Sequence, residues 1–254
     1  MKLKVLKLGG NEIKNISELK KFNFGKLNII SDIKKLDIVY MIDSTGGMGL
    51  WISCVRGALN IIYNKLKRSI ILREYDIKFG GVFYRDPVDV HSDRHEYKCL
   101  GDVKDLVNRM KNIYGEGGGD QPEDWVGAYI IALDEDKMKW REDSVKIIIH
   151  IAGSDAHGKE FCKWDRYPEE GPKLVCLIKK CAREKISIFG YNINDLVKKS
   201  FIECKRIYDE VKSSNCSFDI YKLYSGDEEI TIGKISNDII KHILVFISQN
   251  NRSP

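Results

Sequence analysis

The sequence predicts an α/β fold in which a doubly wound parallel sheet carries helices on both faces. Two observations support this prediction. Segments with strand character alternate with segments of helical periodicity from residue 37 to residue 247, and this alternation is typical of a parallel sheet with helical crossovers. Several strand segments are continuous apolar runs, as in Ile147-Ile148-Ile149, which indicates burial on both faces of the sheet.

In the first half of this pattern, apolar runs lead into polar loops and helices. Residues 37–43 form a short apolar run that ends in the carboxylate of Asp43 and continues into Ser44-Thr45-Gly46-Gly47. A buried strand that enters a glycine-rich loop has this composition. Residues 48–72 have apolar side chains at helical spacing and predict a long helix. The other elements predicted here are strands at 75–84 and 96–100 and a helix at 103–113.

The second half opens with a glycine-rich loop at 115–119 and a helix start. Asp120 can cap a helix, Pro122 is tolerated in its first turn, and the acids that follow favour its positive end. Residues 144–152 are nearly all apolar and predict a central strand that ends in a loop at 153–158. The other predicted elements are helices at 172–183, 196–211 and 235–247 and strands at 186–191 and 218–224.

Residues 1–36 differ from the rest of the chain. Residues 2–8 alternate lysine with aliphatic residues and lead into Gly9-Gly10-Asn11, a pattern compatible with the first half of a hairpin. Residues 17–36 are polar and rich in lysine, as in a connector. We therefore expect an N-terminal extension at 1–36, with a hairpin and a connector, and a single domain at 37–254.

Composition and charge exclude several classes of protein. Hydrophobic residues make up 43% of the chain and charged residues 31%, which is ordinary for a folded globular domain and too apolar for a disordered one. The net charge of +5 comes from basic residues that are scattered along the chain. A nucleic-acid surface would require clustered Arg and Lys, so nucleic acid is not the expected partner.

The cysteines and the absence of export signals indicate the cellular compartment. The seven cysteines are odd in number and none has C-x-x-C spacing, which favours buried, reduced thiols. The N-terminus has no apolar stretch of the signal-peptide kind. No window approaches the roughly 18 apolar residues of a membrane span. We expect a cytoplasmic protein without membrane contact.

Three polar or glycine-rich loops, at 43–49, 115–124 and 153–158, are predicted at the carboxyl ends of the strands. Ligands of open α/β sheets bind at this edge. The loops carry Asp43, Thr45, Asp120 and Asp155, and such oxygen ligands suit a hard cation, namely Mg²⁺ or, alternatively, Mn²⁺ or Ca²⁺. The alternative is that Asp43 and Asp120 only cap the helices that follow them.

The first of these loops resembles the metal-ion-dependent adhesion site of von Willebrand factor A domains, whose first motif is Asp-x-Ser/Thr-x-Ser. Further segments of the chain match the intracellular branch of this family, which includes A domains found beside α-kinase domains in protists, over residues 37–248. The matching segments, in order, are Asp43-Ser44-Thr45-Gly46-Gly47-Met48, Tyr84-Arg85-Asp86, 117–124, Trp140-Arg141, Ile149-His150-Ile151-Ala152, Ala156-His157-Gly158 and Asp165-Arg166-Tyr167-Pro168.

The resemblance implies a Rossmann-like, mostly parallel six-stranded sheet with the short strand near 96–100 antiparallel at one edge. It also implies a metal site made by the first, middle and third loops. Two departures weaken that site: Gly47 replaces the second hydroxyl of the first motif, and Gly153 stands where the third loop has its metal-linked Asp. Asp155 is a candidate substitute if the loop bends differently.

The middle loop keeps Asp120, and Gln121 stands in the region where many members have a Thr. The expected ligands are therefore Asp43, Thr45 and Asp120, with Asp155 as a substitute. Because Mg²⁺ prefers near-octahedral oxygen ligands, so few protein ligands predict weak binding that is completed by water or by a partner's carboxylate. Complete loss of the metal is the alternative.

The resemblance implies a non-catalytic protein-interaction module with a degenerate adhesion site, which binds another protein through an acidic side chain. The alternative is a metal-dependent enzyme, or an accessory domain of an α-kinase-type system that acts in phosphoryl transfer. A hydrolytic triad of Ser154, Asp155 and His157 is disfavoured, because triad members come from separate elements and need a nucleophile elbow. The glycine-rich loop at 43–49 lacks the Lys-Ser/Thr of a phosphate-binding loop.

Overall fold

The computed structural model describes residues 6–8, 11–13 and 33–250, apart from 87–94, 120, 164, 214 and 224–226. The chain forms two units, residues 1–33 and residues 34–254. In the first unit β1 (Leu6–Leu8) and β2 (Asn11–Ile13) pair antiparallel, with Leu8 opposite Asn11. The second unit begins at Lys34, slightly before the predicted boundary at residue 37, and it contains the features described below.

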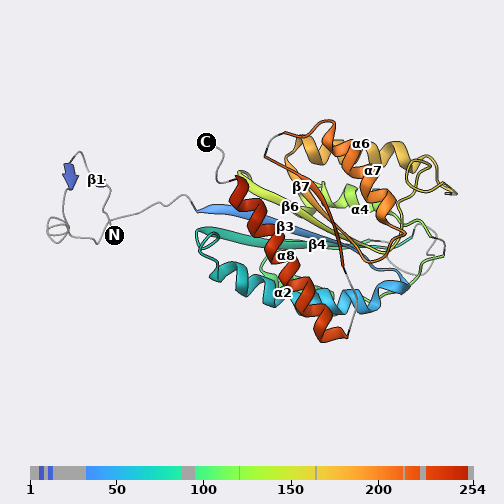
Figure 1. Ribbon diagram of the computed structural model, residues 1–254, viewed down its shortest axis with the longest axis horizontal. Coiled ribbons are helices and arrows are strands. Elements are labelled where there is room, and N and C mark those ends of the chain that lie inside the picture. The colour runs from blue at the N-terminus through green and yellow to red at the C-terminus, as the bar shows by residue number, and fades with distance from the viewer. Residues whose placement is uncertain are drawn as a thin grey trace. The chain divides into compact units, whose positions relative to one another are not determined.

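The second unit is built on a six-stranded sheet with the order β5-β4-β3-β6-β7-β8 (Figure 1). Edge strand β5 pairs antiparallel with β4, and the other neighbouring pairs are parallel. This arrangement confirms the predicted fold class, including the antiparallel strand at one edge. The strands are β3 (Lys34–Asp43), β4 (Tyr75–Tyr84), β5 (His95–Gly101), β6 (Ser144–Ala152), β7 (Ile186–Asn192) and β8 (Phe218–Lys222).

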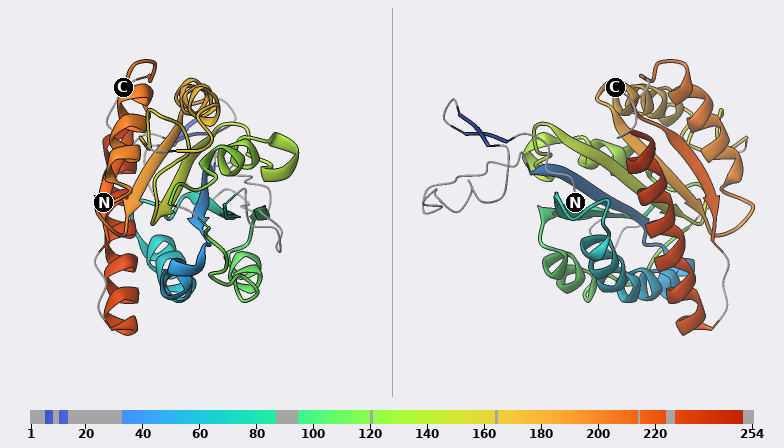
Figure 2. Two further views of the ribbon diagram at one scale, coloured as in Figure 1. Left: turned by 90° about the vertical axis from the view of Figure 1, so that its right-hand side faces the viewer. Right: turned by 60° about the vertical axis from the view of Figure 1, so that its left-hand side comes forward.

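Helices cover both faces of this sheet (Figures 1 and 2). Alternate side chains of each strand enter opposite cores, as Tyr40 and Ile42 of β3 do in one and Val39 and Met41 do in the other. One face is covered by α2 (Gly49–Arg68), α3 (Val103–Met110) and α8 (Glu228–Asn250). The other is covered by α4 (Trp125–Ala132), α5 (Glu135–Met138), α6 (Glu170–Arg183) and α7 (Lys198–Asp209).

Arg141 joins the amino-terminal ends of β3 and β4. Its Nε donates to Oδ1 of Asp37 at 2.7 Å, and its backbone N–H donates to Oδ2 of the same carboxylate at 2.9 Å. Its Nη1 contacts Asp76 at 2.5 Å. Asp37 is fully buried, so its carboxylate has lost its hydration. Arg141 supplies most of the hydrogen bonds and the positive charge that offset this loss. The Trp140-Arg141 motif therefore has a structural role, with Trp140 donating through Nε1 to the carbonyl of Ala132.

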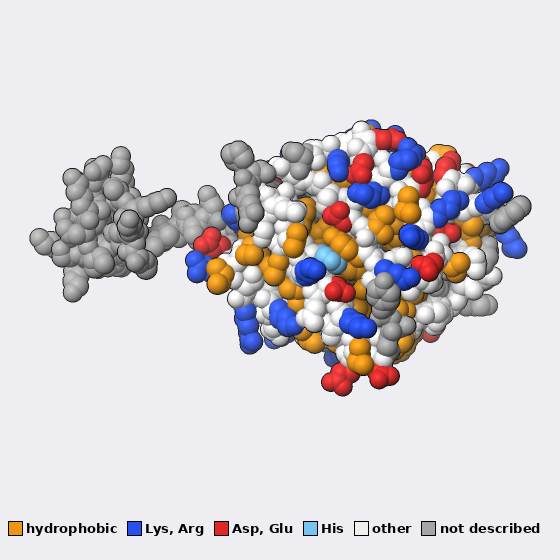
Figure 3. All heavy atoms as spheres, viewed as in Figure 1, with side chains coloured by type: hydrophobic (Ala, Val, Ile, Leu, Met, Phe, Trp, Pro, Cys, Tyr) orange, Lys and Arg blue, Asp and Glu red, His pale blue; other side chains and the backbone are white. Residues whose placement is uncertain are grey.

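The face that α8 crosses shows basic and acidic side chains interspersed among apolar ones (Figure 3). Among the helices in the described part of the chain, none is both long enough and apolar enough to cross a bilayer.

Candidate functional site

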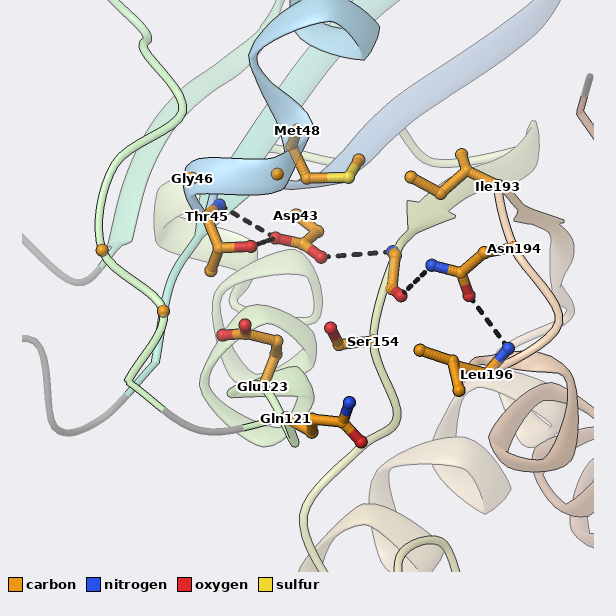
Figure 4. A pocket seen from close by; sticks show the side chains of 14 residues that line it. Asp43, Thr45, Gly46, Met48, Gln121, Glu123, Ser154, Ile193, Asn194 and Leu196 are labelled. Atoms are coloured by element: carbon orange, nitrogen blue, oxygen red, sulfur yellow. Dashed lines mark hydrogen bonds between the residues drawn. The ribbon is translucent and has the colours of Figure 1, made fainter. Parts of the chain in front are cut away.

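A cavity of about 270 Å³ lies at the carboxyl edge of the sheet, where four loop segments meet (Figure 4). The loop after β3 and the segment before α4 face each other across it, and the loops after β6 and β7 close it. This convergence is the one expected for parallel strands that end at a common edge. The lining residues are Asp43, Thr45, Gly46, Gly47, Met48, Gly117, Gly118, Gln121, Glu123, Gly153, Ser154, Ile193, Asn194 and Leu196.

Asp43 is the last residue of β3, and its carboxylate is held by the first and third loops. Oδ1 accepts hydrogen bonds from the backbone N–H of Thr45 at 2.9 Å and from its Oγ1 at 2.7 Å, and Oδ2 accepts one from the N–H of Gly153 at 3.2 Å. Burial raises the pKa of this carboxyl above its ordinary value, although these hydrogen bonds lower it in part. Asp43 is 1% exposed, so its charge lies at the base of the cavity.

Glu123 is a second buried acid of the cavity, and it was not among the ligands predicted from the sequence. Its side chain lines the cavity and lies below Thr45 in Figure 4, with the carboxylate turned toward the side of Thr45. Burial and the nearby charges of Asp43 and Glu123 raise the pKa of Tyr84, which lies beneath both loops. Both carboxylates therefore place negative charge in the same small volume. Among the described residues that line the cavity, none is Lys, Arg or His.

The start of α4 is fixed by a buried aromatic cluster around His150. Trp125 packs edge-on against His150, with ring centroids 4.3 Å apart, and Tyr84 hydrogen-bonds to Nε2 of His150 at 2.8 Å. Burial lowers the pKa of His150 well below its ordinary value, so its ring is neutral near pH 7. Since Glu123 is two residues before Trp125, and its N–H donates to the carbonyl of Asp155 at 2.8 Å, the cluster positions Glu123 at the cavity.

The predicted ligands are only partly brought together. Asp43 and Thr45 share the cavity, whereas Asp120 lies outside the described residues. Asp155 is not among the described lining residues; its Oδ1 accepts from Oγ of Ser200 at 2.7 Å. The ligand roles of Asp120 and Asp155 stay predictions.

The two glycines at expected ligand positions differ in the space around them. A Cβ at Gly153 would lie 3.0 Å from Sδ of Met48 and 3.1 Å from Cδ1 of Ile193, so a side chain would require these two residues to shift. The backbone N–H of Gly153 binds Asp43 instead. A Cβ at Gly47 would have nothing within 4 Å. The missing hydroxyl of the first motif could therefore be restored at Gly47 without a clash.

His157 stabilises the third loop through Asp165. Its Nδ1 lies 2.6 Å from Oδ1 of Asp165, and the N–H of Gly158 donates to Oδ2 at 2.6 Å. Ser154 lines the cavity, while Asp155 is hydrogen-bonded to Ser200. The three side chains of the disfavoured triad thus have separate surroundings among the described residues.

Asn194, in the loop after β7, connects the third loop to the start of α7. Its Nδ2 donates to the carbonyl of Gly153 at 2.6 Å, and its Oδ1 accepts from the backbone N–H of Leu196 at 3.0 Å. Since the N–H of Gly153 binds Asp43, Asn194 supports the residue that holds the carboxylate. We expect Asn194→Ala to lower the free energy of unfolding by about 1–2 kcal/mol, as measured by urea denaturation. Asn237→Ala, on the exposed side of α8, is the control and should change it less.

Comparisons with known proteins agree with this fold. No family model matches the chain. A segment is 32% identical over 146 residues to the alpha-protein kinase vwkA of Dictyostelium discoideum, covering 56% of this chain and 22% of that protein. The chain thus spans about a fifth of this relative's length.

Solved structures with similar folds include two crystal structures of the pilus adhesin SpaC from Lactobacillus rhamnosus GG. Their TM-scores are 0.53 and 0.55, each with 12% identity, and they cover 84% of this chain and 30% and 31% of the adhesin. Proximal thread matrix protein 1 of the mussel byssus has a TM-score of 0.54 at 12% identity, covering 83% of this chain and 46% of that protein. At 12% identity these structures establish a shared fold. The matched segment of 146 residues relates this chain to part of the alpha-protein kinase vwkA.

Proposed function

We propose that this chain is a protein-interaction module of the von Willebrand factor A type, whose cavity binds a divalent cation weakly and presents it to an acidic side chain of a partner. The observation that carries the proposal is a cavity with two buried carboxylates, Asp43 and Glu123, and no basic side chain among its described lining residues. Burial disfavours the charged form of the Asp43 carboxyl and raises its pKa, and a bound cation would favour the charged form.

The donor set fits a hard cation. The carboxylates of Asp43 and Glu123 and the hydroxyls of Thr45 and Ser154 are oxygen donors, the kind that Mg²⁺, Mn²⁺ and Ca²⁺ prefer. A bound cation would supply a Lewis-acidic centre with coordination positions left for water or a partner's carboxylate. In the described part of the chain no group of three or more His, Cys, Asp or Glu is placed to hold a metal.

Thermal unfolding in the presence of Mg²⁺ or Mn²⁺ tests the proposal. A cation at ten times its dissociation constant adds about 1.4 kcal/mol to the stability of the folded state, which corresponds to a rise in Tm of about 3–6 °C for a domain of this size. We expect Asp43→Ala to abolish the rise and Glu123→Gln to reduce it. Gly47→Ser should enlarge it, because the position has room for the second hydroxyl of the motif.

Asp155→Asn is the matched control, because it removes one negative charge while its Oδ1 can still accept from Ser200. The rise in Tm should persist in this variant. A melting curve that is unaffected by cations in the wild type and in Gly47→Ser would contradict the metal part of the proposal. A rise lost in Asp155→Asn but kept in Asp43→Ala would move the site to the loop after β6.

The similarity to vwkA supports a second candidate, an accessory domain of an α-kinase-type system. In this role the cavity would bind a cation that takes part in phosphoryl transfer. The chain would then act either as a metal-dependent enzyme or as an accessory domain of one. Turnover of ATP by the purified chain, lost in Asp43→Asn, would favour this candidate over the interaction module.

A further inference from the structure

A second cavity, of about 370 Å³, lies at the edge of the sheet opposite the candidate site. It is formed where β3, β6 and β7 begin and α8 ends; Figure 1 shows the end of α8 beside the starts of β3 and β6. The residues that line it are Lys34, Lys35, Tyr75, Asp143, Ser144, Val145, Lys146, Lys185, Asn215, Phe246, Ile247 and Asn250. Four lysines thus line the cavity with a single acid, Asp143.

These lysines differ from those on the helices. Lys173, Lys180 and Lys205 each form an ion pair with an acid one turn away on the same helix. In the described part of the chain, no ion pair with a carboxylate within 4.0 Å is found for Lys146 or Lys185. Lysines gathered around one cavity raise the local electrostatic potential and attract anions.

The faces of the strands indicate which lysines lie nearest the cavity. Tyr75 and Val145 belong to the face covered by α8. The ammonium of Lys34 lies over the ring of Tyr75, 5.6 Å from its centroid. Lys185 lines the cavity directly before Ile186, the first residue of β7. Lys34 and Lys185 are therefore the lysines best placed to contact a ligand here.

Two residues of this cavity have left-handed backbone conformations. The φ angles of Asp143 and Lys185 are 58° and 56°, and only Lys139 shares this property among the described non-glycine residues. Lys185 follows the end of α6, a position at which glycine is favoured because it has no Cβ. A lysine at this position is uncommon, because a side chain with a Cβ disfavours the left-handed conformation.

We propose that this cavity binds a phosphate-bearing small molecule, with its phosphate groups near Lys34 and Lys185. Lysine ammonium groups are common phosphate ligands. The apolar part of the ligand would lie against Tyr75, Val145 and Phe246, which form the wall on the α8 side. A phosphate ester of about nucleotide size combines these two properties. The proposal is independent of the cation site, which lies at the other edge of the sheet.

The competing role for these lysines is structural, because α6 and α8 end nearby and cations stabilise helix C-termini. The two roles predict opposite effects of charge removal. If the lysines neutralise helix ends, Lys34→Gln and Lys185→Gln lower the Tm of the protein without ligand. If they form an anion site, charge removal leaves this Tm unchanged or raises it, and Lys185→Gly raises it further by removing the left-handed strain.

Binding is measured with the full chain by calorimetry and by the shift in Tm with ATP and with tripolyphosphate. Lys180→Gln is the matched control, because Lys180 lies on α6, outside the cavity, and its change of charge is the same. We expect Lys34→Gln and Lys185→Gln each to raise the dissociation constant about tenfold or more, the effect of losing one charge-assisted hydrogen bond. Lys180→Gln should leave it unchanged.

A third probe distinguishes the source of the phosphate. Vesicles of phosphatidylcholine that contain phosphatidic acid present the same group on a lipid surface. Vesicle binding that needs Lys34 and Lys185, without binding of the free anions, supports the site and assigns the phosphate to a lipid headgroup. Absence of binding by all three probes overturns the proposal. Equal weakening by Lys180→Gln and Lys185→Gln also overturns it, because it would indicate a general effect of net charge.

Discussion

Arg141→Ala is expected to lower the free energy of unfolding by about 3–5 kcal/mol, the usual effect of removing one partner of a buried ion pair. The variant would leave the carboxylate of Asp37 fully buried, with the backbone N–H of residue 141 as its remaining contact from this position. It would also remove the contact with Asp76 that joins β3 to β4. Urea unfolding with linear extrapolation measures the loss.

Arg206→Ala is the control for this prediction. Arg206 contacts Glu203 and Glu210 on the same helix, and its side chain is 59% exposed. Solvent screens such pairs, so their contribution to stability is small. Equal destabilisation by the two variants would show that Asp37 does not depend on Arg141. Arg141→Lys should be intermediate, because it keeps the charge but loses the planar group that reaches two carboxylates.

Most of the fold could be predicted because its signals are local. Apolar runs such as 144–152 identify buried strands from composition alone. Element ends were less predictable. The strand predicted at 37–43 begins at Lys34, because the two lysines at its start extend it into solvent while keeping ladder pairing with β4. The helix predicted at 235–247 is Glu228–Asn250, because its first turns, which contain Gly233, are less apolar than its centre.

The candidate site was harder to predict because it depends on contacts between distant residues. Asp43 and Thr45 follow a recognisable strand, and both line the cavity. Glu123 resembles an ordinary acid in the first turn of a helix, and only the aromatic packing of Trp125 on His150 brings it to the cavity. The partnership between Asp155 and Ser200 joins residues far apart in sequence. No local pattern distinguishes a ligand from a residue that holds a loop.

Asp165→Asn is expected to lower the free energy of unfolding by about 2–3 kcal/mol at pH 7, the contribution of a hydrogen bond to a charged group. The side chains of Asp165 and His157 are 0% and 2% exposed. The carboxylate accepts from Nδ1 of His157 and from the N–H of Gly158. The side-chain oxygen of asparagine can accept from one of these donors. Its NH2 group would then face the other donor, with which it cannot form a hydrogen bond. Asp195→Asn, whose carboxylate is 78% exposed and pairs with Lys222, should have little effect.

The difference in the free energy of unfolding between wild type and Asp165→Asn should depend on pH, and this dependence is the sharper test. Burial tends to raise the pKa of Asp165, but hydrogen bonds from His157, Gly158 and Tyr167 outweigh it and lower the pKa below the ordinary value of 3.8. A carboxyl with a lowered pKa in the folded state stabilises the fold above its ordinary pKa and loses this contribution as the pH falls through the folded-state value. The stability difference between wild type and Asp165→Asn should therefore be full at pH 7 and shrink below pH 3.8. A difference that stayed constant or grew on acidification would mean that the charge of Asp165 is not what holds the third loop.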